Sequence, residues 1–249
     1  MHAGGAIGVR GAVLTAVIIA RDEEDRIEAA LRSVAFADER LVLDSGSADR
    51  TVEVAESAGA RVVKTDWPGF TAQKNRALEL AGGDWVLSID ADEAVSPELA
   101  RSILAAVAAP SADAFEVSRQ TTWLGHSLRH GFAYPDRRVR LVRRGGGRWV
   151  GPDPHDRLEA RGRVARLSGD LLHNPYRSLG DHLATIDRYS ALDGRAGGIL
   201  DALVRPPWHF VQGYILKAGF RDGWPGLLFA ALGALYTLLK WTRRRVEPR

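Results

Sequence analysis

The first 109 residues alternate short apolar segments with amphipathic ones, and this alternation constrains the fold more than any other feature of the chain. Apolar segments that predict buried strands lie at 17–20, 41–43, 61–65 and 85–89. Stripes that predict helices lie between them, at 27–34, 52–58 and 71–81. Ser96 and Pro97 are typical of the start of a further helix. Strands separated by helices predict an α/β fold with a parallel, right-handed, doubly wound sheet. The alternation fades after about Ala109, and residues 114–173 favour a β-rich second half.

Composition narrows the classes of protein and of site. A chain of 249 residues with 45% hydrophobic residues can bury a full core, as one large domain or as a domain with an appendage. It contains no cysteine, which excludes disulfide bonds, zinc–thiolate sites and cysteine nucleophiles. Residues 1–126 carry 12 Lys and Arg against 20 Asp and Glu, whereas residues 127–249 carry 22 against 11. The second half therefore favours an anionic partner, and nucleic acid is the least favoured one because no nucleic-acid-binding motif accompanies the charge.

The N-terminal apolar stretch Ala12 to Ala20 is superficially similar to the core of a signal peptide. It runs directly into the charged segment Arg21 to Arg26, with no small-residue cleavage site. We therefore expect a first buried strand that follows a flexible, glycine-rich leader over residues 1–12.

The predicted strand at 85–89 is followed by three carboxylates, those of Asp90, Asp92 and Glu93. Strand side chains alternate with a period of two, so Asp90 and Asp92 can point the same way at the carboxyl end, where ligands bind in open α/β sheets. Mg²⁺ takes one or two carboxylates and completes its shell with phosphate oxygens and water, so a metal shared with a diphosphate fits this pattern. The alternative is the first turn of a helix, which also favours acidic residues.

Asp44 follows the predicted strand at 41–43 and would reach the same edge, where it can accept a hydrogen bond from a base imide N–H. An Asx-turn or a helix cap is the alternative for this aspartate. The chain has neither a Gly-x-Gly-x-x-Gly fingerprint nor a Gly-x-x-x-x-Gly-Lys-Ser/Thr loop. Phosphates would then be neutralised by a metal on Asp90 and Asp92, with help from Lys74 or Arg76.

Several ordered motifs give the chain a family resemblance from about residue 13 to residue 240. They are Val17 to Glu24, Leu43 to Thr51, Gln73 to Leu78, Asp90 to Glu93, the pair His155-Asp156, the stretch His173 to Tyr176 and the stretch Gly219 to Gly223. Together they resemble a family-2 glycosyltransferase with the GT-A fold, and more narrowly the lipopolysaccharide-core β-1,4-glucosyltransferase branch.

The resemblance implies roles for single residues. Ala20, Arg21 and Glu23 fall where the family's first loop touches the nucleoside, and Asp44 matches the aspartate that reads the uracil ring. Asp90 matches the carboxylate near the ribose. Asp92 matches the residue that binds Mg²⁺ or Mn²⁺ beside the diphosphate, and Lys74 lies in the stretch that borders the nucleotide.

Two residues depart from the family pattern: Asp22 stands where Asn is more usual, and Asp156 stands where Glu is commoner. Inverting transfer needs a base for the acceptor hydroxyl and a cation for the leaving diphosphate, and we assign Asp156 to the first role and Asp92 with its metal to the second. The alternative for His155 and Asp156 is a hydrogen-bonded pair in a surface loop. His173 is predicted either as a third metal ligand or phosphate contact, or as a core histidine.

The basic and apolar segments of the second half bear on acceptor and location. Arg137 to Arg144 predicts either contacts to an anionic glycolipid or a half-solvated strand whose charges face water. Gly223 to Leu239 are seventeen uncharged residues, slightly fewer than a spanning helix needs, and a basic cluster follows from Lys240. Nearby tryptophans favour monotopic attachment to the cytoplasmic face of a membrane, with a hydrophobic dimer interface as the alternative.

The sequence thus predicts a metal-dependent inverting glycosyltransferase that moves a hexose from a nucleotide sugar, UDP-linked by resemblance, to a glycolipid or lipopolysaccharide-type acceptor. The alternatives are a sugar-nucleotide nucleotidyltransferase and a non-catalytic nucleotide-sugar-binding membrane scaffold. We expect a GT-A domain over 13–195, with a nucleotide-sugar half at 13–109 and an acceptor half at 110–195. A helical membrane-associating tail is expected over 196–249.

Overall fold

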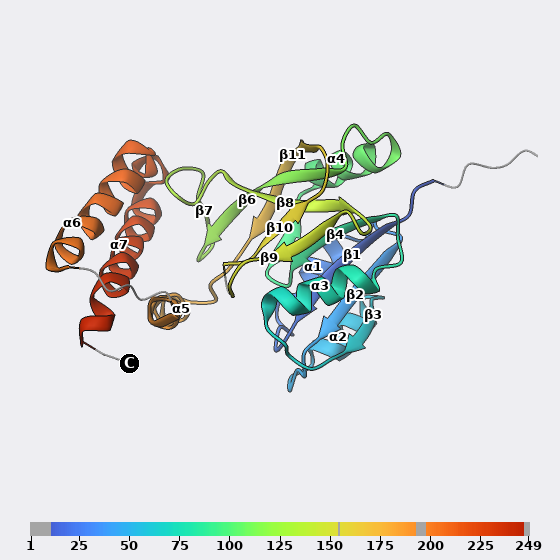
Figure 1. Cartoon of the computed structure of the whole chain (residues 1–249), viewed down its shortest axis with the longest axis horizontal. Helices are drawn as coiled ribbons and strands as arrows, with labels where there is room; N and C mark the ends of the chain where they lie inside the picture. The colour runs from blue at the N-terminus through green and yellow to red at the C-terminus, as the bar shows by residue number, and fades with distance from the viewer. Residues whose placement is uncertain (1–10, 154, 193–197, 247–249) are drawn as a thin grey trace, which may run out of the picture. The chain divides into compact units, whose positions relative to one another are not determined.

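The chain forms two compact units in this computed structural model, which describes residues 11–153, 155–192 and 198–246 (Figure 1). Unit 1 comprises the chain up to Val117 together with Arg138–Asp170, and unit 2 comprises Ser118–Arg137 together with the chain from Leu171 onward. Most of the predicted leader and the predicted boundary at residue 195 lie outside the described residues. The predicted domain division therefore stays a prediction.

The first part of unit 1 alternates strands and helices as predicted. Its elements are β1 (Leu14–Ala20), α1 (Ile27–Ser33), β2 (Glu39–Asp44), α2 (Thr51–Ser57), β3 (Arg61–Lys64), α3 (Phe70–Leu80), β4 (Trp85–Asp90), β5 (Glu93–Val95) and α4 (Pro97–Ala108). Helix α4 begins as expected, because the Ser96 hydroxyl accepts a hydrogen bond from the Leu99 N–H at 3.2 Å and Pro97 occupies the first turn.

Residues 114–173 are rich in β-strands, again as predicted. The strands there are β6 (Ala114–Trp123), β8 (Asp136–Arg143), β9 (Gly147–Val150), β10 (Arg157–Ala160) and β11 (Val164–His173). The strand order is β3-β2-β1-β4-β8-β6-β11-β5, while β9 and β10 form a separate antiparallel pair. The β1–β2, β1–β4 and β2–β3 pairs are parallel, and β4–β8 is antiparallel. Register aligns Ala20 with Asp44 and Ile19 with Asp90, so three strands end together at one edge.

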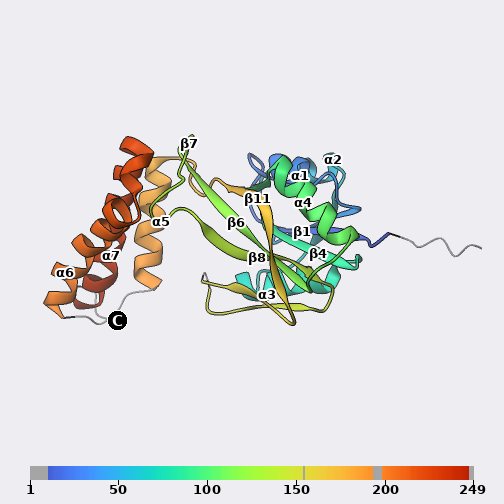
Figure 2. The same cartoon turned by 90° about the horizontal axis from the view of Figure 1, so that it is seen from above.

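Helix α3 covers one face of the parallel part of the sheet and α1 and α2 cover the other, while α4 packs against β11 (Figure 2). Ala77 and Leu78 of α3 pack against strand residues such as Val17 and Leu43, and Trp149 closes the same cluster. Helices α1 and α4 bury the apolar stripes that the sequence predicts, including Leu31 and Leu99. Strands buried on both faces explain why the strand segments are almost uninterrupted apolar runs.

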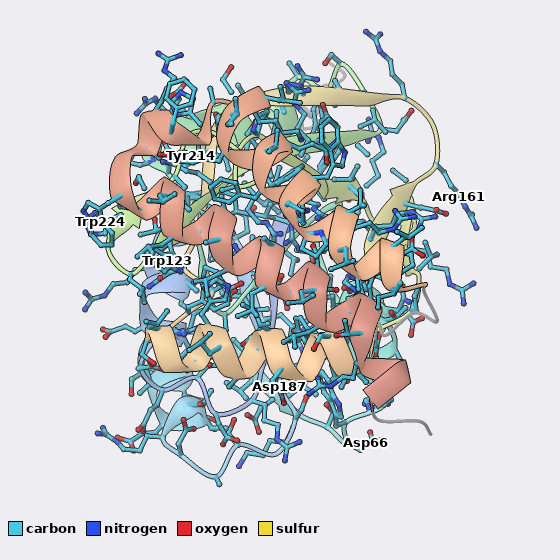
Figure 3. All side chains as sticks on the ribbon, turned by 90° about the vertical axis from the view of Figure 1, so that its left-hand side faces the viewer. Asp66, Trp123, Arg161, Asp187, Tyr214 and Trp224 are labelled. Carbon is cyan, nitrogen blue, oxygen red and sulfur yellow. The ribbon has the colours of Figure 1, made fainter. Side chains whose placement is uncertain are left out.

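Unit 2 is built mainly from helices that follow the sheet. It holds β7 (His126–Ser127), α5 (Leu179–Leu192), α6 (Ile199–Phe210), the π-helical η1 (Val211–Leu216), the 3₁₀-helical η2 (Gly219–Asp222) and α7 (Gly223–Val246). Its core contains the buried Trp123, Leu128 and Ala133, against which Tyr176, Phe229 and Leu232 pack. Helix α7 contacts both α5 and α6, and the three lie side by side (Figure 3).

Close packing of α7 depends on glycine. A Cβ at Gly226 would lie 2.1 Å from the carbonyl oxygen of Gly219, and a Cβ at Gly233 would lie 2.9 Å from Nε2 of His209. A small cavity of about 40 Å³ remains beside these glycines, lined among others by Phe132, His209 and Phe229. A side chain at Gly226 would require the backbone to move, and one at Gly233 would require the His209 ring to turn away, so both glycines allow the close packing of α7.

Among the described residues, the segment Gly219–Arg243 is the one stretch of helix long and apolar enough to cross a membrane, judged by length and composition alone. The most apolar window of this segment has a mean hydropathy of 1.2, and 17% of that window is buried. The predicted α/β class, with a Rossmann-like parallel half and an apolar C-terminal helix, is therefore confirmed.

Protonation of His182 is expected to make the stability of the protein pH-dependent. The side chain is 5% exposed, its Nδ1 accepts the Trp123 indole N–H at 3.0 Å, and burial lowers its pKa to about 4 although Asp181 opposes the shift. In the unfolded chain the pKa of this histidine is about 6.5, so below that pH the unfolded chain binds a proton that His182 in the folded protein does not bind. The free energy of unfolding should therefore fall by about 2 kcal/mol as the pH drops from 6.5 to 4. Urea denaturation across this pH range should show this loss in the wild type and a smaller one in His182→Gln. An equal dependence of the unfolding free energy on pH in the two proteins would contradict the prediction.

Candidate active site

The candidate site lies at the edge where β1, β2 and β4 end. The parallel register brings Ala20, Asp44 and Asp90 to this edge from three strands. Carboxyl ends of parallel strands are where open α/β sheets bind ligands. The sheet therefore brings together three residues that are far apart in the sequence, as we predicted from the strand ends for Asp44 and Asp90.

Asp90 and Asp92 reach this edge by a route that differs from the prediction. Asp90 is the last residue of β4, but Asp92 lies in a turn that leads into the short strand β5. The alternation of strand side chains therefore does not relate the two carboxylates, and neither does a helix begin there. Asp92 is partly exposed, with its Oδ2 3.8 Å from Nη1 of Arg26.

Lys74 of α3 connects two of the predicted carboxylates. Its Nζ lies 3.1 Å from Oδ1 of Asp90 and 3.2 Å from Oδ2 of Asp156, and 4.3 Å from the centre of the Trp149 ring. Both Lys74 and Asp156 are almost fully buried. Ion pairs at this separation in a water-poor site are far stronger than on the surface, provided that every charge has a partner. Arg76 instead pairs with Asp66 at 2.8 Å, so of the two predicted basic helpers only Lys74 lies at the site.

Asp156 is placed by a loop that is fastened to α3. Asp153 accepts hydrogen bonds from the N–H groups of Phe70 (2.7 Å) and Thr71 (3.0 Å), which are otherwise unsatisfied in the first turn of α3. The side chain of Asn75 pairs with both the N–H and the carbonyl of Trp149. Burial alone would raise the pKa of Asp153, but these donors lower it below its ordinary value. The loop and α3 therefore form one hydrogen-bonded piece that carries both Lys74 and Asp156.

The alternative reading of Asp156 as half of a surface pair with His155 does not describe its carboxylate. That carboxylate is buried against Lys74, whereas His155 is exposed. The sequence showed that a lysine, Lys74, lies on the predicted helix before this loop, but not that it pairs with Asp156. The two residues are 82 positions apart, so no local pattern connects them.

Sequence reasoning missed Arg140 and Glu93. Nη2 of Arg140 lies 2.6 Å from Oε1 of Glu93 and 3.1 Å from Oδ2 of Asp90, while Oε2 of Glu93 accepts the Asp90 N–H at 2.9 Å. Burial by itself lowers the pKa of Arg140, but Glu93 and Asp90 more than reverse this and raise it above the ordinary value. Arg140 faces inward from β8 and fixes the end of β4. The alternative that the charges of the arginine-rich segment face water is therefore wrong for this residue.

The first loop and Asp44 sit at the same edge. Asp44 is buried, and its carboxylate accepts the N–H groups of Gly46 (3.1 Å) and Ser47 (3.2 Å), which is the Asx-turn arrangement kept as an alternative. The Glu23 N–H donates to the Thr51 hydroxyl at 2.7 Å, and the exposed Arg21 lies 3.8 Å from Asp22. These contacts order the loop, and the assigned nucleoside contacts of Ala20, Arg21, Glu23 and Asp44 stay predictions.

His173, the predicted third metal ligand, is the last residue of β11 and belongs to unit 2, whereas the other predicted site residues belong to unit 1. Among the described residues, no group of three or more His, Asp or Glu side chains is placed to hold a metal ion by itself. The ligation of His173 stays a prediction.

The charges at the site suit a divalent cation. Three cations and six carboxylates are linked by ion pairs here, namely Lys74, Arg140 and Arg26 with Asp90, Asp92, Glu93, Asp156, Glu23 and Asp25. The group thus carries a formal excess of three negative charges. Carboxylate oxygens are the donors that Mg²⁺ and Mn²⁺ prefer, and Mg²⁺ needs only one or two of them when a substrate supplies phosphate oxygens. The residues present therefore fit the metal that the sequence predicts.

Removal of the Arg140 guanidinium tests the buried pair. In Arg140→Met the buried Glu93 loses its counter-charge, which should cost about 3–5 kcal/mol of unfolding free energy. Arg137→Met, an exposed arginine of the same strand, is the control and should change stability by less than about 0.5 kcal/mol. Urea denaturation measures both, and equal losses in the two variants would show that the Arg140–Glu93 pair does not stabilise the fold.

Comparison with known proteins agrees with the geometry. The family model for glycosyl transferase family 2 matches residues 15–143. The lipopolysaccharide core biosynthesis glycosyltransferase LpsC of Rhizobium meliloti (strain 1021) is 29% identical over 91% of this chain and 89% of that protein. An uncharacterized glycosyltransferase of Rickettsia typhi (strain ATCC VR-144 / Wilmington) is 26% identical over 93% of this chain and 86% of its own.

A solved structure, glucosyl-3-phosphoglycerate synthase from Mycobacterium tuberculosis with Mn²⁺, UDP and glucosyl-3-phosphoglycerate, is 28% identical. The match covers 46% of this chain and 45% of that one, with a TM-score of 0.38, too low for the two arrangements to be equated. The family model alone covers more than half of the sequence, and it includes the strand ends, Lys74 and the Asp90–Glu93 turn. The chain therefore belongs to glycosyl transferase family 2 and is a glycosyltransferase.

Proposed function

We propose that the protein is a metal-dependent inverting glycosyltransferase that moves a hexose from a UDP-sugar to a lipopolysaccharide-type glycolipid at the cytoplasmic face of a membrane. The observation that carries this proposal is the position of Lys74, whose ammonium lies 3.1 Å from Asp90 and 3.2 Å from Asp156. One buried cation thus joins the carboxylate at the donor edge of the sheet to the carboxylate assigned as the base.

Buried polar atoms around this cation support a polar ligand. Within the described residues, Nε and Nη1 of Arg140, Nε1 of Trp149 and Nη2 of Arg26 are buried without a hydrogen-bond partner. Buried donors are normally satisfied, so such a group is expected where a ligand or ordered water completes the site. A diphosphate with its sugar offers the acceptors that these N–H groups lack.

Each residue has a separate task in the proposed transfer. Ala20, Arg21, Glu23 and Asp44 bind the nucleoside, Asp90 lies near the ribose, and Lys74 borders the diphosphate. Asp92 and Asp90 would hold Mg²⁺ or Mn²⁺, which supplies positive charge for the departing diphosphate. Asp156 accepts the proton of the acceptor hydroxyl as that oxygen bonds to the anomeric carbon and the bond to the phosphate oxygen breaks, releasing UDP.

The acceptor and location rest on different observations. The relative LpsC bears the name of a lipopolysaccharide core biosynthesis enzyme, which favours an anionic glycolipid acceptor. The second half of the chain carries 22 Lys and Arg against 11 Asp and Glu, which suits an anionic acceptor and an anionic leaflet. Helix α7 has the apolar composition that monotopic attachment requires.

Replacement of Asp156 tests the base. Asp156→Asn keeps the size of the side chain but cannot accept the proton, so turnover should fall about 10²- to 10⁴-fold. UDP binding, measured by titration calorimetry, should stay within about threefold of the wild type. Glu159→Gln, which changes an exposed carboxylate of the following strand β10, is the control and should retain its turnover. Near-normal turnover of Asp156→Asn would exclude Asp156 as the base.

Replacement of Asp92 tests the metal and the donor together. Wild-type protein with Mn²⁺ should slowly hydrolyse one member of a panel of UDP-, GDP- and dTDP-sugars in the absence of acceptor, and we expect the UDP-sugar. Asp92→Asn should lose this hydrolysis at least about 10²-fold and should also lose the Mn²⁺-dependent part of UDP binding. Release of pyrophosphate from a nucleoside triphosphate would indicate a nucleotidyltransferase instead. Binding without any hydrolysis or transfer would indicate a scaffold.

A further inference from the structure

Large apolar side chains are exposed on one region of unit 2. On α6 and on the η1–η2 turn with the first turn of α7, each of the following is more than half exposed: Ile199, Leu200, Leu203, Val204, Trp208, Ile215, Leu216, Phe220 and Trp224. We call these nine residues the apolar face. Soluble monomers rarely expose so many large apolar side chains close together in the chain, so the face is expected to be covered.

Basic residues interrupt the apolar face and identify what covers it. Arg205, Lys217 and Arg221 are exposed among its members. Asp201 pairs with Arg205 at 2.7 Å and offsets that charge, whereas Asp222 pairs with His130 at 2.7 Å, so Lys217 and Arg221 leave the stretch with a positive excess. From residue 198 to the end, the sequence holds 8 Lys and Arg against 3 Asp and Glu. Apolar residues with tryptophans and flanking cations are typical of a segment that lies at anionic lipid headgroups.

Helix α7 is accompanied by the amphipathic helix α5, which carries the exposed charged residues Asp187 and Arg188. Near its start, Phe229 lies 5.8 Å from the ring of His182. Near its end, Nη1 of Arg243 donates to the Ser190 hydroxyl at 2.8 Å, and Arg243 also pairs with Asp187. Figure 3 shows α5, with Asp187 labelled, running beside α7. The two helices therefore run together from Phe229 to Arg243.

This pairing determines how α7 can meet a membrane. A bilayer-spanning α7 would carry α5 into the hydrocarbon with the exposed Asp187 and Arg188, and charged side chains at that depth cost several kcal/mol each. The start of α7 is also tied down, because Asp222 accepts the N–H groups of Arg129 (3.0 Å) and His130 (2.9 Å). Both ends of α7 are thus joined to polar parts of unit 2.

We propose that the apolar face lies in the plane of an anionic lipid surface, with α6 and the η1–η2 turn inserted among the headgroups, and that α7 does not cross the bilayer. The inference rests on the proposed membrane location and adds the surface and its orientation. It assigns the larger share of the membrane contact to α6, which lies outside the segment Gly219–Arg243.

The absence of cysteine allows a direct test, since a single introduced cysteine has no background. Leu203→Cys on the apolar face and Ala184→Cys at an exposed position of α5 are labelled with an environment-sensitive fluorophore and mixed with vesicles of phosphatidylcholine and phosphatidylglycerol. The Leu203 label should shift to the blue and brighten at least about twofold, while the Ala184 label should not change. A response of the Ala184 label equal to that of the Leu203 label would overturn the assignment of the face.

Orientation is tested with a membrane-impermeant maleimide added outside preformed vesicles that carry the protein. Arg129→Cys lies beside the start of α7, because the N–H of residue 129 donates to Asp222, and Thr242→Cys lies near the end of α7; both should react to the extent seen after detergent is added. Reaction at one end only, with the other end protected until detergent is added, would show that α7 spans the bilayer and would overturn the inference.

Charge substitution separates this inference from the proposed function. Leu203→Glu should lower the vesicle-bound fraction at least about tenfold, whereas Leu104→Glu, an exposed leucine of α4 in unit 1, should leave it unchanged. Donor hydrolysis in detergent should be unaffected in both variants. Absence of hydrolysis in the wild type would count against the proposed function alone. Protection of the Leu203→Cys thiol without vesicles, with sedimentation as a dimer, would show that a second copy covers the face and would overturn the inference.

Discussion

A single ammonium group holds the two halves of the candidate site together. Lys74 stands between Asp90, at the end of the central strand β4, and Asp156, in the loop after β9. The buried carboxylate of Asp156 needs this counter-charge, whereas the partly exposed Asp90 also has Arg140, so the placement of Asp156 depends on the placement of α3. That placement is secured by Asp153 at the start of the helix and by Asn75 one turn further on. The geometry of the site thus follows from how one helix is capped and fastened.

The elements of unit 1 could be predicted because their signals are local. Apolar runs marked the strands, Ser96 and Pro97 marked the start of α4, and the parallel order followed from the alternation. The convergence of Asp44 and Asp90 then followed from the rule that parallel strands end at one edge. The role of Asp92 stays a prediction from the family resemblance, and the strand argument for it was wrong because the chain turns after Asp90.

Arg140, Glu93 and Arg26 could not be predicted, because their environment is set by pairing between distant segments. Arg140 lies in an arginine-rich strand where neighbouring arginines are exposed, and only the β4–β8 pairing shows which one faces inward. In the sequence, Glu93 is one of three closely spaced acidic residues that are also typical of the start of a helix. In the structure it is fully buried and accepts the Asp90 N–H across the turn after β4. In unit 2, the apolar stretch of α7 was visible in the sequence, but its attachment to α5 through Arg243 was not.

Glycine at positions 226 and 233 has a consequence for how the tail can change over time. The space beside Gly226 is filled by the backbone carbonyl of Gly219, so any side chain there would force the chain apart, whereas the neighbour of Gly233 is the His209 ring, which would have to turn away. The outward residues of α6 and α7 meet no such limit and can exchange one apolar type for another. Substitution in the tail is thus directed outward, where it alters the surface without rebuilding the packing beneath.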